Sequence, residues 1–210
     1  LCLLHHNYDW KGFKDAIEAI KIVRSQNCKI KIVVFGEKLQ DPAPLFEKAS
    51  FKFEYHYRPT GEALRKIYSS FSTFLCSSWY EGLGMPAMET MMCGMVLVAT
   101  DTGGSFDYAW NEETALVSPP KNPVALAKNL IRVLTDNSLR LNLAEKGFQR
   151  IEIFSWESNC EFLVKRFEDC LNKKMAQKIS KKRLFLFATI PLLFFLLVLE
   201  FGLRLFGNSN

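Results

Sequence analysis

Apolar and polar positions follow two patterns along most of this chain, one typical of strands and one typical of helices. Short apolar runs of strand length, such as KIKIVVF at 29–35 and MVLVAT at 95–100, adjoin segments whose apolar residues recur every three to four positions. In the segment 12–25, for example, Phe13 and Ile17 fall on one helical face. Apolar strands that alternate with helices are typical of a parallel sheet covered on both faces. The pattern therefore predicts an α/β fold with a Rossmann-like parallel sheet.

The expected elements follow from these runs and from the residues that end them. The predicted strands cover 1–6, 29–35, 51–55, 73–77 and 95–100. The predicted helices cover 12–25, 61–71, 86–93, a segment that begins at Asn122-Pro123, 137–149 and 156–172. We expect one Rossmann-like domain over 1–172, with its ligands bound at the carboxyl ends of the strands.

The chain after residue 172 breaks this pattern. Six Lys and Arg residues and no acid occupy 173–183, and sixteen uncharged residues follow them. At ~1.5 Å per residue the uncharged run spans about 24 Å, and further apolar residues extend it toward the thickness of a bilayer. We expect a basic linker over 173–183, a transmembrane anchor over 184–206 and a tail over 207–210. A buried core helix or an aggregation-prone tail is the alternative. The positive-inside rule then places the domain on the cytoplasmic side of a membrane.

Charge and cysteine content exclude several classes of function. The 210 residues carry a net charge of +5, but residues 1–172 hold 20 basic and 21 acidic residues. Because this body is nearly neutral, nucleic acid is not an expected partner. The six cysteines form no C-x-x-C pair, which is typical of a reducing compartment and implies no metal site.

The segment 77–89, directly after the fourth predicted strand, carries the candidate chemistry. Gly82 and Gly84 allow a tight turn, and the proline that follows starts a helix whose N-terminal N–H groups favour a phosphate. Glu81 and Glu89 flank this turn. Carboxylates repel phosphate, so their expected partners are hydroxyl groups on either side of it. A nucleotide-sugar has hydroxyls at both ends and phosphates between them. The alternative is an ordinary turn with both acids in solvent.

This segment resembles a family signature. EGLGMPAMETMMCGMVLVATDTGG, at 81–104, is similar to the E-x7-E signature of family 4 glycosyltransferases, which have the GT-B fold. The resemblance extends to Trp10-Lys11-Gly12 and covers about residues 1–172. It implies the C-terminal, donor-binding half of a hexosyltransferase with a nucleotide-sugar donor and a glycan acceptor. The expected membrane anchor, not the resemblance, suggests a lipid-linked acceptor. It also implies that the acceptor-binding half is missing from this chain, which begins at Leu1.

The resemblance assigns roles by position. Glu81 would contact and stabilise the donor sugar, and Glu89 would bind ribose hydroxyls. Lys11 would offset the charge of the leaving diphosphate, although a surface lysine is the alternative. The remaining donor-binding positions are Ser78, Gly82, Leu83, Gly84, Gly103 and Gly104.

One position departs from the family pattern. The family usually has Arg where this chain has His6, and neutral histidine would neutralise a diphosphate less well. His56 and Arg58 fall in a loop where the family often contacts the base. Members usually retain the anomeric configuration and need no metal. The absence of a D-x-D motif here agrees with that, so no cofactor is expected. No nucleophile or general base is assigned.

Two other functions stay open beside a membrane-anchored transferase of cell-surface glycan or lipid-linked polysaccharide synthesis. A non-catalytic, membrane-tethered nucleotide-sugar-binding module would keep the same turn. A GT-B sugar-nucleotide epimerase would share the phosphate-binding turn, but generally lacks the E-x7-E pattern.

Overall fold

The computed structural model describes residues 1–36, 49, 51–176, 189–190 and 194–195, with the side chains of 173–176 excepted. The chain divides into two compact units, Leu1–Ser155 and Trp156–Asn210, and each is described by itself.

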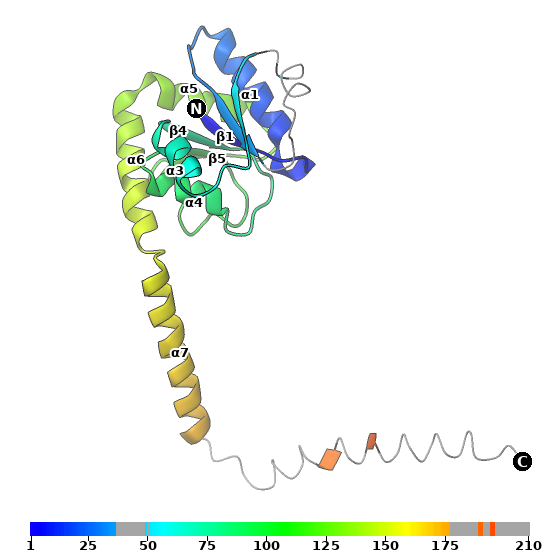
Figure 1. The fold of residues 1–210 in the computed structure, drawn as a ribbon, viewed down its shortest axis with the longest axis vertical. Coiled ribbons are helices and arrows are strands. Elements are labelled where there is room, and N and C mark those ends of the chain that lie inside the picture. The colour runs from blue at the N-terminus through cyan, green and yellow to red at the C-terminus, as the bar shows by residue number, and fades with distance from the viewer. Residues whose placement is uncertain (37–48, 50, 177–188, 191–193, 196–210) are drawn as a thin grey trace, which may run out of the picture. The chain divides into compact units, whose positions relative to one another are not determined.

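Six parallel strands form one sheet in the order β3-β2-β1-β4-β5-β6 (Figure 1). The strands are β1 Cys2–His5, β2 Val33–Gly36, β3 Glu54–Tyr57, β4 Thr73–Cys76, β5 Val96–Thr100 and β6 Ala115–Ser118. The predicted parallel α/β sheet is confirmed. Because the strand order reverses between β1 and β4, the connections after these two strands diverge and open a crevice at their carboxyl ends.

Helices cover both faces of this sheet. The helical segments with described bounds in the first unit are the 3-10 turn η1 Asp9–Lys11 and the helices α1 Phe13–Ser25, α3 Gly61–Ser69, α4 Met85–Met92, α5 Pro123–Thr135 and α6 Asn137–Glu152. Side chains of α1 and α5 pack on one face of the sheet, and side chains of α3 and α4 pack on the other. All these helices lie within a few residues of their predicted bounds.

The alternation of side chains along the strands divides the core between these two faces. In β5, Val96 and Val98 join the cluster that α1 and α5 cover, whereas Leu97 and Ala99 join the cluster that contains Met91 of α4. All five residues are buried. The four successive apolar residues of this strand are therefore explained by burial of both its faces.

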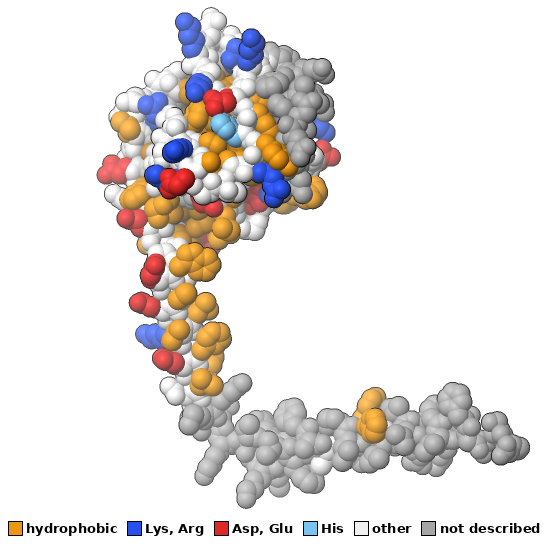
Figure 2. Space-filling model, in the orientation of Figure 1, with side chains coloured by type: hydrophobic (Ala, Val, Ile, Leu, Met, Phe, Trp, Pro, Cys, Tyr) orange, Lys and Arg blue, Asp and Glu red, His pale blue; other side chains and the backbone are white. Residues whose placement is uncertain are grey.

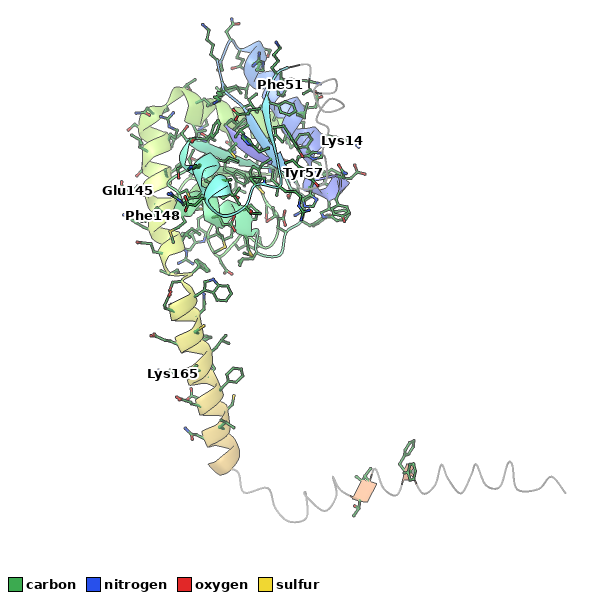
Figure 3. The ribbon with its side chains drawn as sticks, in the orientation of Figure 1. Lys14, Phe51, Tyr57, Glu145, Phe148 and Lys165 are labelled. Atoms are coloured by element: carbon green, nitrogen blue, oxygen red, sulfur yellow. The ribbon has the colours of Figure 1, made fainter. Side chains whose placement is uncertain are left out.

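Helix α6 packs closely on α4. Its buried positions, Leu143, Gly147 and Ile151, recur at the four-residue spacing of one helical face. Gly147 permits the close approach, because an added Cβ would lie 2.9 Å from the Met91 methyl group. Glu145 and Phe148 lie on the exposed side of the same helix (Figure 3).

Two strands differ from the sequence prediction. β6 was not predicted, because its four residues lie among polar neighbours and form no long apolar run. The strand predicted at 51–55 forms at Glu54–Tyr57 instead. Phe51 and Phe53 produced the apolar pattern, but they enter the core just before the strand begins. β3 itself is an edge strand, so its side chains are largely exposed.

The second unit begins with α7, Trp156–Ala176, and the predicted domain boundary at residue 172 falls inside this helix. Apolar side chains gather along one side of α7 and acidic ones along the other (Figure 2). Most of the predicted linker and anchor, 173–206, lies outside the described residues. In the part of the chain that the structure describes, no helix is both long and apolar enough to cross a membrane.

Candidate functional site

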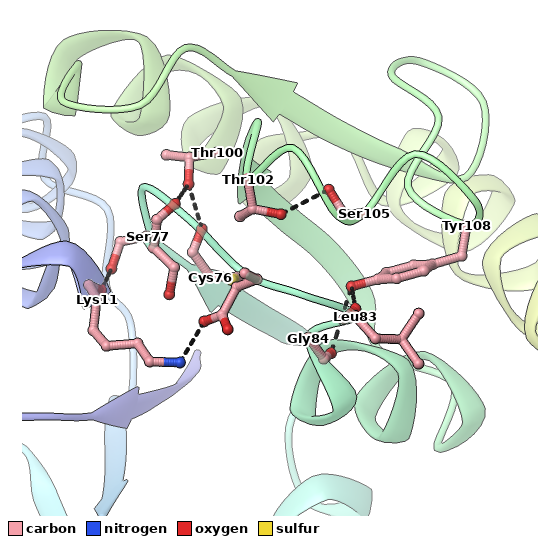
Figure 4. A network of polar contacts seen from close by, with 11 residues as sticks. Lys11, Cys76, Ser77, Leu83, Gly84, Thr100, Thr102, Ser105 and Tyr108 are labelled. Atoms are coloured by element: carbon pink, nitrogen blue, oxygen red, sulfur yellow. Dashed lines mark hydrogen bonds and ion pairs between the residues drawn. The ribbon is translucent and has the colours of Figure 1, made fainter. Parts of the chain in front are cut away.

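The loops that follow β1 and β4 meet at the carboxyl edge of the sheet. Lys11 ends η1 and Glu81 follows β4, 70 residues later, and Lys11 Nζ donates to Glu81 Oε1 at 2.7 Å (Figure 4). The two side chains are 21% and 18% exposed, so the ion pair is partly shielded from solvent. The structure thus places the two residues with predicted catalytic roles in direct contact.

Backbone contacts hold these two loops together independently of the ion pair. The Trp79 N–H donates to the Trp10 carbonyl at 2.6 Å, and Ser77 Oγ donates to the Lys11 carbonyl at 3.2 Å. Gly12 has a φ of +61°, and an added Cβ would lie 1.9 Å from the Ser77 carbonyl oxygen. Glycine is therefore required at position 12, because the backbone has a positive φ and the Ser77 carbonyl leaves no room for a Cβ.

The glycine turn leads directly into α4. Gly84 is the N-cap with a φ of +73°, and the helix has Pro86 in its first turn and no acidic residue there. The Tyr108 hydroxyl donates to the Leu83 carbonyl at 2.8 Å, and this buried residue supports the turn (Figure 4). The N–H groups and dipole at this helix end favour a bound anion.

A loop after β5 packs against the glycine turn from the other side. The Glu81 N–H donates to the Thr102 carbonyl at 3.2 Å. The Thr102 hydroxyl donates to Ser105 Oγ at 3.1 Å, which braces the loop (Figure 4). Gly104 lies against this turn so closely that an added Cβ would be 1.6 Å from the Gly82 carbonyl oxygen.

The neighbouring Gly103 meets different constraints. Its φ is +77°, and an added Cβ would meet no described atom within 4 Å. Its N–H donates to Asp101 Oδ1 at 3.1 Å. Gly103 therefore allows the loop its backbone conformation, whereas Gly104 allows the loop to pack against the glycine turn.

Several predicted site residues line one cavity at this edge, which we call the edge cavity. They are His6, Lys11, Ser78, Glu81 and Gly84. The first turn of α4 closes the cavity. A cation, a carboxylate and a helix N-terminus thus face one space at the carboxyl ends of β1 and β4.

His6 lies at the side of the edge cavity. Its ring stacks on Tyr8, with the ring centroids 5.3 Å apart and the planes at 22°. Its side chain lines the edge cavity together with Lys11. Lys11 is the cation of this cavity.

Glu89 faces a different space. It lines a groove between α3 and α4, and the Tyr68 hydroxyl donates to Glu89 Oε2 at 3.1 Å. Burial, reinforced by the Glu89 charge, raises the pKa of Tyr68, so the phenol keeps its proton and remains a donor. Along the helix axis Glu89 lies about 8 Å beyond the N-cap Gly84, at ~1.5 Å per residue. Glu81 and Glu89 therefore lie on opposite sides of the N-terminal part of α4 and line two different pockets.

The structure does not place the candidate base-contact residues in the edge cavity. His56 Nε2 lies 2.8 Å from Glu54 Oε1 on the edge strand, where both side chains are exposed. Arg58 has a φ of +47°, and its N–H donates to the Gly36 carbonyl at 2.8 Å. Within the described ranges, no cluster of three or more His, Cys, Asp and Glu could hold a metal ion.

Sequence reasoning missed the residues that support the turn from within. Tyr108 lies outside the 81–104 segment, and Thr100 lies inside it but was assigned no role, yet Tyr108 binds the turn and the Thr100 hydroxyl donates to the carbonyl of Ser78. Thr100 ends an apolar strand and Tyr108 lies in a loop, so neither position signals a buried hydrogen bond. Only the fold shows that they face the same loop.

Replacing Tyr108 by phenylalanine is expected to destabilise the protein by about 1 kcal/mol, because it removes a hydrogen bond beneath the turn while keeping the ring. Urea denaturation followed by circular dichroism measures this change. Tyr80→Phe is the matched control. Because Tyr80 is 68% exposed, the loss of its hydroxyl group should leave the free energy of unfolding unchanged. Equal stability of Tyr108→Phe and the wild type would contradict the role of the hydroxyl.

Known proteins share this fold. The C-terminal domain of the glycosyl transferase group 1 family protein LpcC from Francisella tularensis is similar with a TM-score of 0.63 and 20% identity, over 72% of this chain and 83% of that one. A sucrose-phosphate synthase from Thermosynechococcus elongatus is similar with a TM-score of 0.68 and 24% identity, over 82% of this chain and 46% of that one. These structures share the GT-B type of α/β fold.

Sequence comparison identifies the family. The O-antigen chain mannosyltransferase B of Escherichia coli is 31% identical over 99 residues, which are 47% of this chain and 25% of that protein. This chain therefore spans about a quarter of that relative's length. The family model described as "Glycosyl transferases group 1" matches residues 2–150, which is most of the chain and includes the whole edge cavity. The chain belongs to the group 1 glycosyl transferases.

Proposed function

We propose that this chain is the donor-binding part of a glycosyltransferase, one that transfers a sugar from a nucleotide-sugar to a glycan or lipid-linked acceptor. The Lys11–Glu81 pair beside the glycine turn carries this proposal, because it sets a cation and a carboxylate next to a helix N-terminus. The likeness to a C-terminal domain of a group 1 protein supports the assignment to the donor half. The E. coli relative named as an O-antigen chain mannosyltransferase supports a glycan acceptor.

The geometry suggests how the diphosphate is held. The α4 N-terminus offers N–H groups, and the Lys11 ammonium has three donors, so it can bind Glu81 and a phosphate oxygen together. Both groups stay in place as negative charge develops on the leaving diphosphate. Stabilising that charge with preorganised donors is a large contribution to catalysis in group transfer.

Glu81 has the complementary task. Its carboxylate is already oriented by Lys11 and its N–H is fixed by the Thr102 carbonyl, so it can accept hydrogen bonds from sugar hydroxyls without reorganising. Glu89, on the other side of the helix end, is held by Tyr68 and is proposed to accept from ribose hydroxyls.

Glu89→Gln is expected to weaken binding of a nucleoside diphosphate about tenfold while leaving binding of inorganic pyrophosphate unchanged. The amide oxygen can still accept from Tyr68, but it loses the charge that strengthens hydrogen bonds from ribose. Isothermal titration calorimetry with UDP, GDP, TDP and pyrophosphate measures both effects.

Glu62→Gln is the matched control. Glu62 is an exposed residue of α3 that pairs with Arg65, and its replacement should affect neither ligand. If Glu89→Gln bound nucleotide as tightly as this control, Glu89 would not be a ribose ligand.

We also propose that the uncharged segment within 184–206 anchors the protein in a membrane, with the group 1 domain on the cytoplasmic side. The basic residues in 173–183 and the apolar composition after them support this. The full chain should then stay in the pellet after carbonate extraction. Its release into the supernatant would contradict the anchor.

A further inference from the structure

A second cavity adjoins the edge cavity, and we call it the aromatic hollow. Its volume is about 630 Å³, and its walls are formed by Asp9, Trp10, Trp79, Tyr80 and Lys121. Glu81 lines both the hollow and the edge cavity. A molecule in the hollow would therefore lie next to the carboxylate proposed to hold the donor sugar.

Exposed rings form one wall of the hollow. The Trp10 ring stacks on Tyr8, with ring centroids 4.4 Å apart and planes at 11°. Both residues are 45% exposed, and Tyr80 is 68% exposed. Clustered exposed aromatic side chains beside a pocket are typical of ligand-binding surfaces rather than of ordinary protein exterior.

Trp79 forms a second wall and is fixed in place. Its indole N–H donates to Asp15 Oδ2 of α1 at 2.7 Å, and the Lys121 ammonium lies 4.3 Å from its ring centroid. Lys121 itself has a φ of +59°, which is unusual for a residue with a side chain. Trp79 is therefore an oriented wall of the hollow.

The lining matches a pyranose ring. Such a ring has C–H groups that pack against aromatic planes and hydroxyls around its rim that bind charged groups. Trp10 and Trp79 offer the planes. The Asp9 carboxylate and the Lys121 ammonium are an acceptor and a donor for hydroxyl groups.

We propose that the aromatic hollow binds a pyranose ring of the acceptor glycan and holds it beside Glu81. This inference rests on the proposed transferase function, because a ring at this place can receive a sugar only if the diphosphate of a donor is held at the edge cavity. It assigns part of the acceptor contact to the same domain that binds the donor.

The four tryptophans provide a direct test in the full chain. The protein is labelled with ¹⁵N at the tryptophan indoles, and the signals are assigned with single Trp→Phe variants. Titration with methyl α-D-mannopyranoside and methyl α-D-glucopyranoside should shift the Trp10 and Trp79 signals saturably with at least one sugar. Trp110 and Trp156 are internal controls, and Trp156 is 81% exposed, so it reports non-specific contact.

Two variants sharpen the test. Trp10→Ala should lower the sugar affinity measured from the Trp79 signal at least tenfold, whereas Trp156→Ala should leave this affinity unchanged. The proposal is overturned if the sugars shift neither Trp10 nor Trp79, or if they shift Trp156 equally. It is also overturned if UDP, GDP or TDP displaces the sugar, since the hollow would then belong to the donor.

Nucleotide titration of the same sample separates this inference from the proposed function. Nucleotide binding without sugar shifts would overturn the acceptor site alone. The absence of nucleotide binding would overturn the proposed function, whatever the sugars do.

Discussion

Replacing Gly104 by alanine is expected to destabilise the protein by about 3 kcal/mol, at the upper end of the usual cost of overpacking, and to abolish nucleotide binding. The new Cβ would lie 1.6 Å from the Gly82 carbonyl oxygen and 2.3 Å from that of Glu81. Both contacts are with backbone atoms, so a side-chain rotation cannot relieve them. The turn that leads into α4 must move, and Glu81 moves with it. Urea denaturation and calorimetric titration with UDP, GDP and TDP measure the two effects.

Gly82→Ala is the matched control for stability. It is the same substitution on the opposite side of the contact, but its Cβ would meet no described atom within 4 Å. We expect a change in the free energy of unfolding of less than about 1 kcal/mol. If Gly104→Ala were as stable as Gly82→Ala, the two loops would not pack as the structure shows.

Lys11→Ala is expected to weaken binding of both nucleoside diphosphate and pyrophosphate by about 10- to 100-fold. It removes the side-chain cation of the edge cavity and leaves Glu81 to repel the phosphates. Its effect on stability should be below about 1 kcal/mol, because the ion pair is still partly exposed. Calorimetry at two salt concentrations should show a weaker salt dependence in the variant.

Lys14→Ala controls for the loss of a positive charge nearby. Lys14 pairs with Asp9 at 3.0 Å, and both side chains are strongly exposed (Figure 3). Its replacement should leave nucleotide and pyrophosphate affinities unchanged. Equal affinities in Lys11→Ala and Lys14→Ala would show that Lys11 does not bind the diphosphate.

The parallel sheet could be predicted because burial on both faces produces a simple pattern. β5 has four apolar residues in succession, and the helices between the strands have clear periodicity. The edges of the sheet were harder to predict. The side chains of β3 are largely exposed, and β6 is a short buried segment among polar neighbours. At β3 the apolar residues Phe51 and Phe53 fill the core ahead of the strand, which moved the prediction upstream.

The sequence predicted that Lys11 and Glu81 belong to the same edge of the sheet, but not that they are in contact. Parallel strands bring their carboxyl ends to one edge, but the strand order that makes β1 and β4 neighbours is set by the whole fold. The separate positions of Glu81 and Glu89 depend on the entry angle of α4, which the sequence pattern does not specify. Tyr108 was not predictable, because its role arises from a loop folding back under the turn.

The central claim is that the edge cavity binds the diphosphate of a nucleotide-sugar, and titration of the full chain with UDP, GDP and TDP tests it most directly. We expect saturable binding of at least one of the three with one site per chain, weakened in Lys11→Ala and unchanged in Lys14→Ala. Absence of binding by all three nucleotides to the folded wild-type protein would contradict the account.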